Sequence, residues 1–441
     1  MRVHDCRVQH IREPISLSPP QERAILVGTP PKGALARHAA AEHLAELARL
    51  ADTAGANVVA SITQQLERPD PATYLGSGKV EELQALVADR EATLIIFDDE
   101  LSPAQGKNLE EALSKRVVDR AELILDIFAT RARTAEAKMQ VELAQLEYSL
   151  PRLTRLWTHL ERYRGGVGVR GPGETQLETD RRLVGHRIRV LKDRLADVAR
   201  ARAVQRESRR GVFRAALVGY TNAGKSSILG ALARDKDVFV EDRLFATLDP
   251  LTRDVALDDR HTALVTDTVG FIRKLPHHLV ASFRATLEEL RDADVLVHVV
   301  DASHPTWEEQ RTVVEEVVHE IGASDRPVVY AFNKVDKLDP ANANALRDRV
   351  SALLPNAVFV SAIRQNGLAP LREALLNAIL ANRPITELTV PISDGRLLAQ
   401  VHREAEVISR RTEDSTVVLR VRAEREAIGR LVASGATHNT T

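Results

Sequence analysis

A glycine-rich stretch, GYTNAGKS at residues 219–226, carries the most specific chemistry in the sequence. It follows an apolar run and precedes a helical pattern, which is the strand–loop–helix setting of a phosphate-binding loop. Backbone N–H groups from Asn222 to Lys225 can surround phosphate oxygens at the start of a helix. The ammonium group of Lys225 can neutralise the β- and γ-phosphates, and the Ser226 hydroxyl can ligate Mg²⁺.

A second motif, NKVD at residues 333–336, indicates which base is bound. The Asp336 carboxylate can accept hydrogen bonds from the ring N–H and the exocyclic amine of guanine, an arrangement that adenine does not offer. Asn333 can tie this motif to the phosphate loop. The next strand ends in SAI at residues 361–363, where the Ala362 N–H can meet the guanine carbonyl oxygen. The two motifs together predict a guanine-nucleotide site.

Two further segments are candidate switches that sense the γ-phosphate. The D-x-x-G pattern begins at Asp267, which would hold Mg²⁺ through water, and ends at Gly270, whose N–H would contact the γ-phosphate. The segment LFATLDPLTR at residues 244–253 lies between the phosphate loop and this pattern. Within it we predict Thr247 as the ligand of Mg²⁺ and the γ-phosphate, with Thr252 as the alternative.

The residue after Gly270 is Phe271, where many nucleotide switches have a Gln that orients the attacking water. A Phe side chain cannot orient water. Two interpretations stay open: Phe271 packs the second switch against the core, or it marks an enzyme that positions water by other means. No catalytic side chain is therefore assigned.

The predicted nucleotide contacts come from all of these motifs. They are Gly219, Tyr220, Thr221, Asn222, Ala223, Gly224, Lys225, Ser226, Phe245, Ala246, Thr247, Leu248, Asp249, Asp267, Thr268, Val269, Gly270, Asn333, Lys334, Val335, Asp336, Ser361, Ala362 and Ile363. The predicted metal ligands are Ser226 and Thr247, with Asp267 acting through water.

The composition, with 441 residues of which 44% are hydrophobic and 28% charged, indicates a soluble globular chain. Cys6 is the only cysteine, which excludes an intrachain disulfide and a cysteine metal cluster. The N-terminal residues lack the apolar core of a signal peptide, and the apolar runs are too short to span a bilayer. We therefore expect a cytoplasmic protein, and peripheral membrane association stays open.

Strand and helix patterns alternate in two regions, which predicts an α/β multidomain chain. Residues 1–20 are predicted as a flexible tail and residues 21–130 as a small α/β domain with a parallel sheet. The four strands expected in this domain are residues 24–31, 57–64, 93–100 and 117–125. Residues 212–384 are predicted as a larger domain of the phosphate-loop class, with a mostly parallel sheet and helices on both faces.

Between these domains, residues 131–211 are predicted as two antiparallel helices joined by a glycine-rich basic loop at residues 164–180. From Arg152 to Arg214 there are sixteen Arg and one Lys against seven acidic residues, a net charge of +10 on a chain of net charge −1. This asymmetry indicates a segment that faces a polyanion. A solvated helical pair with a disordered connector is the alternative.

The C-terminal region is predicted as a small α+β module at residues 385–433, with a hairpin at residues 406–424. A tail is expected at residues 434–441. Nothing in this region indicates a role.

The order of GYTNAGKS, LFATLDP, DTVGFIRKLP, NKVD and SA resembles the translation-factor-related GTPases, and most of all the HflX family. The resemblance continues outside this domain, through YLGSGKVEEL, FDDELSPAQGKNLE and GGVGVRGPGETQLETDRR. It covers roughly residues 21–383, and the C-terminal module is its least matched part.

This resemblance implies a GTPase, slow on its own and stimulated by ribosomes, that binds the large (50S) ribosomal subunit and splits stalled or idle ribosomes. It implies a monomer that contacts ribosomal RNA through the loop Gly165–Gly173 and through Arg152, Arg155, Arg162, Arg164 and Arg170. In related potassium-dependent GTPases, an Asn at the position of Asn222 holds K⁺, so K⁺ is a candidate cofactor beside GTP, GDP and Mg²⁺.

Three other functions remain as alternatives. The protein could mature the large subunit instead of recycling ribosomes. It could remodel RNA with ATP, although Asp336 argues against ATP at this site. It could also be a regulatory binding module in which GTP sets affinity and turnover is incidental.

Overall fold

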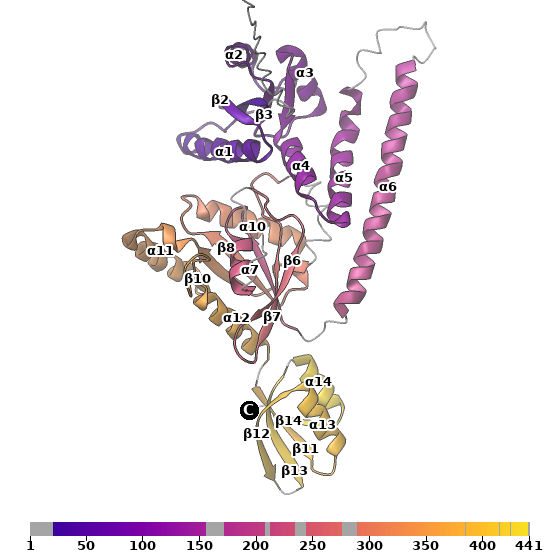
Figure 1. Ribbon diagram of the computed structural model, residues 1–441, viewed down its shortest axis with the longest axis vertical. Coiled ribbons are helices and arrows are strands. Elements are labelled where there is room, and N and C mark those ends of the chain that lie inside the picture. Colours follow the sequence, from indigo (N-terminus) through magenta and orange to yellow (C-terminus); the bar gives the residue numbers. More distant parts are fainter. Residues whose placement is uncertain are drawn as a thin grey trace, which may run out of the picture. The chain divides into compact units, whose positions relative to one another are not determined.

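A computed structural model describes residues 21–155, 172–207, 212–233, 244–275, 289–383, 385–413, 415–423 and 425–439 (Figure 1). The chain divides into two compact units, one of residues 1–130 and 145–185 and the other of residues 131–144 and 186–441. The predicted tail at residues 1–20 lies outside the described residues. Within the described residues, every helix is too short or too polar to cross a membrane.

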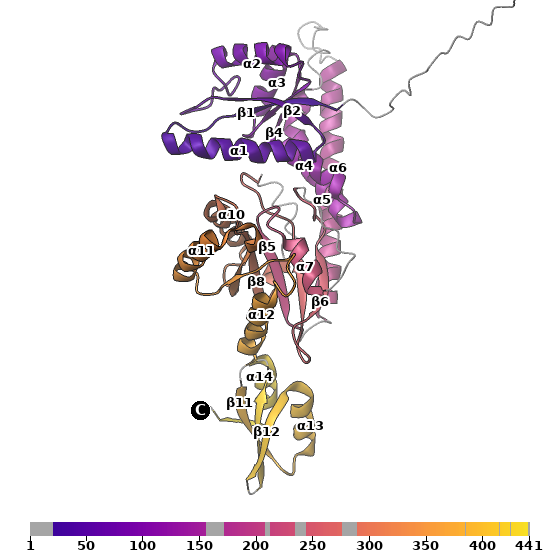
Figure 2. The same ribbon diagram turned by 60° about the vertical axis from the view of Figure 1, so that its left-hand side comes forward.

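The first unit contains a parallel sheet of four strands in the order β2-β1-β3-β4. The strands are β1 (Arg23–Gly28), β2 (Asn57–Thr63), β3 (Leu94–Phe97) and β4 (Arg116–Asp119). Figure 2 shows α2 (Ser77–Asp89) and α3 (Pro103–Leu113) on one face of this sheet and α1 (Ala34–Thr53) on the other. All four residues of β3 are buried, as expected for a parallel sheet covered on both faces.

The strand predicted at residues 117–125 is wrong from residue 120 onward. Strand β4 ends at Asp119, and helix α4 (Arg120–Arg131) begins at the next residue. The Asp119 carboxylate accepts a hydrogen bond from the Glu122 N–H at 2.9 Å, which stabilises the start of the helix. Because α4 is buried along much of its length, its sequence is nearly as apolar as that of a strand.

Helices α5 (Ala135–Ser149) and α6 (Pro172–Glu207) follow, with a 3-10 turn, η1 (Leu150–Arg155), after α5. Arg187 of α6 pairs with Glu142 of α5 at 2.6 Å, and Arg202 pairs with Glu136 at 2.7 Å, so the two helices run antiparallel. The predicted loop at residues 164–180 is too long, because α6 already begins at Pro172. Proline suits this place, since its fixed φ and missing N–H cost nothing in a first turn.

The second unit contains a sheet of six strands in the order β10-β9-β8-β5-β7-β6, in which only β6 is antiparallel to its neighbour. The strands are β5 (Arg214–Gly219), β6 (Leu251–Ala256), β7 (Thr262–Asp267), β8 (Val295–Asp301), β9 (Val328–Asn333) and β10 (Ala357–Phe359). Strands β5, β7 and β9 end at Gly219, Asp267 and Asn333, so three predicted motifs start at the same edge of the sheet.

Helices cover both faces of this sheet. Helices α7 (Lys225–Ala233) and α12 (Ala369–Asn382) share a core with alternate strand residues such as Val299 and Ala331. Helices α10 (Trp307–Ile321) and α11 (Pro340–Leu353) share another core with the neighbouring residues Val300 and Phe332. Successive strand residues therefore pack on opposite faces, as the pleat requires.

The C-terminal module is an antiparallel sheet in the order β12-β13-β11-β14. Its strands are β11 (Ile385–Pro391), β12 (Glu406–Glu413), β13 (Thr416–Arg422) and β14 (Thr437–Asn439). Helices α13 (Gly395–Glu404) and α14 (Arg425–Ala433) share one core with the sheet (Figure 2). Strands β12 and β13 form the predicted hairpin. The tail predicted at residues 434–441 is wrong in part, because β14 pairs with β11.

Candidate functional site

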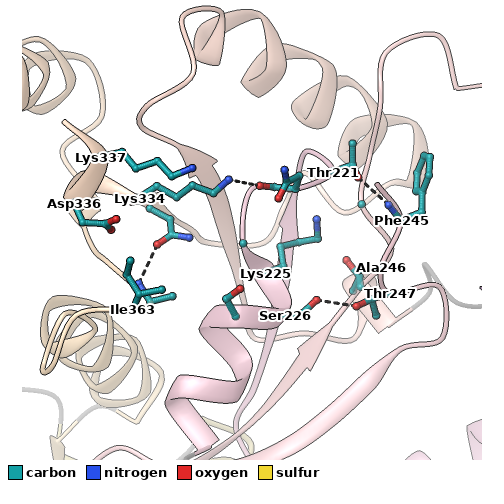
Figure 3. A pocket seen from close by; sticks show the side chains of 17 residues that line it. Thr221, Lys225, Ser226, Phe245, Ala246, Thr247, Lys334, Asp336, Lys337 and Ile363 are labelled. Atoms are coloured by element: carbon teal, nitrogen blue, oxygen red, sulfur yellow. Dashed lines mark hydrogen bonds between the residues drawn. The ribbon is translucent and has the colours of Figure 1, made fainter. Parts of the chain in front are cut away.

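A cavity of ≈ 280 Å³ lies at the edge of the six-stranded sheet where β5 and β9 end (Figure 3). The phosphate loop, both switch segments, NKVD and SAI all contribute to it. Its lining residues are Thr221, Asn222, Gly224, Lys225, Ser226, Ser227, Phe245, Ala246, Thr247, Thr268, Gly270, Asn333, Lys334, Asp336, Lys337, Ala362 and Ile363. Segments up to 142 residues apart in the sequence thus meet in one cavity.

Two glycines of the phosphate loop have no room for a side chain. A Cβ atom on Gly219 would lie 2.3 Å from the Val299 carbonyl oxygen, and one on Gly224 would lie 2.3 Å from Asn333 Nδ2. Gly224 also has φ +96°, in the region that favours glycine. Helix α7 begins directly after it, at Lys225, so the loop ends at a helix N-terminus.

The Lys225 side chain is buried beneath the loop. Its Nζ donates hydrogen bonds to the carbonyl oxygens of Gly219 and Tyr220, both at 3.0 Å. Burial lowers the pKa of Lys225 to about 8, and the nearby Asp267 carboxylate opposes this shift. The ammonium group is therefore held at the floor of the cavity, with its charge incompletely compensated.

Three oxygen-bearing side chains converge beside Lys225. The Ser226 hydroxyl lies 2.7 Å from the Thr247 hydroxyl (Figure 3) and donates to Asp267 Oδ2 at 2.6 Å. Asp267 is fully buried, and its Oδ1 has no hydrogen-bond partner among the described residues. Burial raises the pKa of Asp267, and Lys225 opposes this. Two hydroxyls and a buried carboxylate whose charge is only partly compensated are oxygen donors of the kind that Mg²⁺ takes.

The alternative Mg²⁺ ligand, Thr252, lies elsewhere. It belongs to β6, and its hydroxyl is 2.9 Å from that of Thr266 on β7. Thr252 does not line the cavity, whereas Thr247 does.

The base-reading motif is hydrogen-bonded to the phosphate loop. Asn333 Nδ2 donates to the Ala223 carbonyl oxygen at 3.0 Å, and Asn333 Oδ1 accepts from the Ala362 N–H at 3.2 Å. Lys334 Nζ donates to the Asn222 carbonyl oxygen at 2.7 Å. The Asp336 carboxylate accepts from the Ser361 hydroxyl at 2.5 Å, which orients it. Base and phosphate recognition thus rest on one network.

Comparison with known proteins agrees with this geometry. Three family models match the chain: GTP-binding GTPase N-terminal at residues 41–129, GTP-binding GTPase Middle Region at residues 131–209, and 50S ribosome-binding GTPase at residues 214–334. The chain is 46% identical over 414 residues to the GTPase HflX of Magnetococcus marinus, a match that covers 93% of this chain and 94% of that protein. The chain belongs to the HflX family. It binds and hydrolyses GTP, as the GTPase domain and the family both indicate.

Other HflX proteins are similar at comparable identity. The GTPase HflX of Escherichia coli is 43% identical over 385 residues, which cover 86% of this chain and 89% of that protein. Among solved structures, a GTP-binding protein from Sulfolobus solfataricus in complex with GDP is 25% identical, with a TM-score of 0.43. That match covers 81% of this chain and 98% of the Sulfolobus chain.

In this HflX chain, Phe271 is a packing residue and does not line the cavity. Its side chain is fully buried. Its N–H donates to the Gly219 carbonyl oxygen at 3.1 Å, and its carbonyl oxygen accepts from the Thr221 N–H at 2.7 Å. These bonds form a parallel bridge between the second switch and the phosphate loop. The burial supports the first of the two interpretations of Phe271.

Several predicted nucleotide contacts do not line the cavity. They are Gly219, Tyr220, Ala223, Leu248, Asp249, Asp267, Val269, Val335 and Ser361. Ala223, Asp267 and Ser361 instead support residues that do. The side chains of Tyr220 and Asp249 have other partners, so their predicted nucleotide contacts stay predictions. The Tyr220 hydroxyl accepts from the Arg273 N–H at 2.9 Å, and the Asp249 carboxylate accepts from the Arg133 N–H at 3.1 Å.

Two residues that line the cavity, Ser227 and Lys337, are absent from the predicted set. Each directly follows a predicted residue, so the position next to a motif was the only sequence feature that could have indicated these two residues. Asp301, at the end of β8, is also absent from that set, and it pairs with Lys334 at 2.8 Å. Its position at a strand end was the only signal.

The Arg152 guanidinium makes hydrogen bonds and an ion pair within the first unit. Its guanidinium donates to the carbonyl oxygens of Leu101 at 2.7 Å and Tyr148 at 3.0 Å, and it lies 3.6 Å from the centre of the Tyr148 ring. It also pairs with the buried Asp119 at 3.4 Å. The structure thus gives Arg152 several partners within the first unit, and its predicted contact with RNA stays a prediction. The Arg155 side chain, Arg162, Arg164, Arg170 and the loop from Gly165 to residue 171 lie outside the described residues.

Replacing Phe271 with Gln tests its packing role. We expect Phe271→Gln to lower the free energy of unfolding by about 2–4 kcal/mol, because a buried amide loses its hydrogen bonds to water. The GTP turnover rate should not rise, because the side chain does not face the cavity. Urea denaturation and single-turnover hydrolysis measure the two effects. The control Phe271→Leu should cost about 1 kcal/mol. Faster turnover with unchanged stability would contradict the packing role.

The lowered pKa of Lys225 predicts proton uptake on nucleotide binding. With a pKa of about 8, we expect roughly half of the Lys225 side chains to be neutral at pH 8 in the free protein, and we expect bound phosphates to raise this pKa again. GDP binding at pH 8 should therefore take up about half a proton, measured by calorimetry in buffers of different ionisation enthalpy. The variant Lys225→Arg should bind without uptake, because guanidinium stays charged. Equal uptake by both proteins would contradict this.

Proposed function

We propose that this GTPase acts on the large (50S) ribosomal subunit and, in its GTP-bound form, splits stalled or idle ribosomes in the cytoplasm. The observation that carries this proposal is the match of residues 214–334 to a family described as a 50S ribosome-binding GTPase, within a chain of the HflX family. The net charge of +10 between Arg152 and Arg214 supports it independently. Clustered Arg residues neutralise phosphates, which contact with ribosomal RNA requires.

In the proposed site, the phosphate loop and Lys225 bind the β- and γ-phosphates, and the Gly270 N–H contacts the γ-phosphate. Ser226 and Thr247 hold Mg²⁺, with Asp267 acting through water. When bound, the ion neutralises charge that develops on the phosphate oxygens. Asp336 and the Ala362 N–H select guanine, and the Lys334 stem covers the base.

Hydrolysis by this site depends on help in placing the water. Phe271 is packed into the core, so it supplies nothing at the γ-phosphate. Phosphoryl transfer needs mostly positioning and charge stabilisation, so the absence of one side chain slows the reaction without abolishing it. We propose that a monovalent cation at Asn222, the ribosome, or both provide what is missing.

A cation at Asn222 makes turnover depend on the alkali metal. We expect the rate in K⁺ to exceed the rate in Na⁺ by about tenfold or more at equal ionic strength, because a correctly sized cation replaces an arginine finger. Asn222→Ala should reduce the rate in K⁺ to the rate in Na⁺. Equal rates of the unaltered protein in both salts would reject the role of potassium.

Binding to ribosomes is tested by sedimentation with GTP, GDP or a non-hydrolysable GTP analogue. Binding or splitting should require the GTP form, and large subunits should raise turnover markedly above the slow rate of the isolated protein. The triple variant Arg162→Glu, Arg164→Glu, Arg170→Glu should bind subunits at least about tenfold more weakly at physiological salt, since three phosphate contacts are lost. Its turnover without ribosomes should be unchanged.

A matched control reverses three exposed charges in the other unit, the second, namely Arg260, Arg349 and Arg411, which are 81%, 58% and 65% exposed. This control should bind subunits like the unaltered protein. Binding that does not depend on the nucleotide would argue against the switch. Binding only to immature particles would favour a role in subunit assembly.

A further inference from the structure

The carboxylate of Asp249 joins the first switch segment to the start of helix α5. Asp249 stands two residues after Thr247, but it does not line the nucleotide cavity. Its Oδ2 accepts hydrogen bonds from the backbone N–H groups of Arg133 at 3.1 Å and Thr134 at 3.3 Å, and its Oδ1 accepts from the Thr134 hydroxyl. These partners directly precede α5 and lie outside the six-stranded sheet.

Thr134 caps α5 while it binds Asp249. Its hydroxyl oxygen accepts from the Ala137 N–H at 3.1 Å while its proton goes to Asp249. The first N–H groups of a helix have no partner within the helix, and the helix dipole favours an anion beside them. An aspartate here makes charge-assisted hydrogen bonds, the stronger class. The first switch segment is therefore bound, through Asp249, to the N-terminus of α5, which favours a carboxylate.

The other end of the switch segment is fastened to the phosphate loop. The Phe245 N–H donates to the Thr221 hydroxyl at 3.1 Å (Figure 3), and the side chains of Phe245 and Leu248 are buried. With both ends held, the Thr247 hydroxyl lies 2.7 Å from that of Ser226. The hydrogen bonds of Asp249 are therefore made in the same structure in which the Thr247 and Ser226 hydroxyls lie close enough to ligate one metal ion.

The first turn of α5 also connects to the segment that follows the second switch. Glu136 pairs with Arg202 of α6 at 2.7 Å, and Arg202 lies 4.0 Å from Glu289. Burial raises the pKa of Glu136; Arg202 opposes this, and the nearby Asp249 adds to it. The start of α5 thus stands in one charged cluster with Asp249, Arg202 and Glu289.

We propose that Asp249 is a positioning residue for GTP: by binding the start of α5 it holds Thr247 where it ligates Mg²⁺, and so couples the γ-phosphate to the helical pair. This inference rests on the role proposed above for Thr247. The coupling is reciprocal, as thermodynamic linkage requires. GTP orders the start of α5, and a partner that moves α5 changes the affinity for GTP.

The first test compares affinities for GDP and a non-hydrolysable GTP analogue in the full chain with Mg²⁺. Asp249→Ala should weaken binding of the analogue by about 5- to 10-fold and leave GDP binding within roughly twofold, because GDP places no demand on the first switch. The control Asp254→Ala removes the same charge from an exposed position in β6 and should change neither affinity. A merely structural role of Asp249 would weaken both nucleotides alike.

Thr247→Ala separates the two proposals. If it lowers the preference for the analogue and Asp249→Ala does not, the inference about Asp249 is wrong. If neither does, the proposed role of Thr247 is wrong as well.

Thr134 provides a second route that leaves the switch sequence intact. Thr134→Val, which lacks the hydroxyl, should reproduce part of the loss, and Thr134→Ser should retain the affinity of the unaltered protein. The double variant of Thr134→Val and Asp249→Ala should lose less than the sum of the two single losses. In the unaltered protein, the analogue should slow hydrogen exchange at the Thr134 and Ala137 amides relative to GDP. Additive losses and nucleotide-independent exchange would overturn the inference.

Discussion

The nucleotide site is arranged around the buried carboxylate of Asp267, whose negative charge must be compensated by its neighbours. Asp267 ends strand β7, which lies between β5 and the edge strand β6, is fully buried, and has one oxygen without a hydrogen-bond partner among the described residues. A buried anion is costly unless a cation stands beside it. Lys225 provides part of this compensation, and its own pKa is lowered in return. The site is therefore built for further positive charge, and Ser226 and Thr247 supply the remaining oxygens around it.

A second constraint is the close contact between the phosphate loop and the second switch. The backbone of Phe271 is hydrogen-bonded to both Gly219 and Thr221, and the Tyr220 hydroxyl binds the Arg273 N–H. The segment is thus tied to the loop at two places before the part that lies outside the described residues. A packed residue at position 271 strengthens this tie. It also leaves position 271 without a polar side chain that could orient water, so the packing of this segment and the lack of that side chain have a common origin.

The nucleotide site was predictable where a local pattern fixes backbone geometry. Gly219 and Gly224 stand where any side chain would collide, so the spacing of GYTNAGKS leaves few alternatives. The partners of Asp249 and Arg152 were not predictable in this way. Asp249 binds Thr134 from 115 residues away, and Arg152 binds Leu101 from 51 residues away. Nothing in the composition of either segment distinguishes an arginine or aspartate used internally from one exposed to a partner.

Fold predictions failed for similar reasons. The apolar residues after Asp119 suit a buried helix as well as a strand, and only the hydrogen bond from Glu122 to Asp119 marks where the helix begins. The three residues of β14 are polar and too short to give a periodic pattern. Strand β14 exists because β11 offers it an edge, which is a tertiary effect.

The hydrogen bonds of Asn333 have a consequence for how nucleotide selectivity can be altered. Asn333 joins Ala223 of the phosphate loop to Ala362 of the guanine loop, whereas Asp336 is held from one side by Ser361. A changed Asn333 therefore disturbs the grip on the phosphates together with the choice of base. A changed Asp336 alters the hydrogen-bonding face offered to the base and leaves the phosphate loop anchored. If Asp336 selects the base as proposed, variants that accept another base are best sought by substituting Asp336, because Asn333 still anchors the phosphate loop.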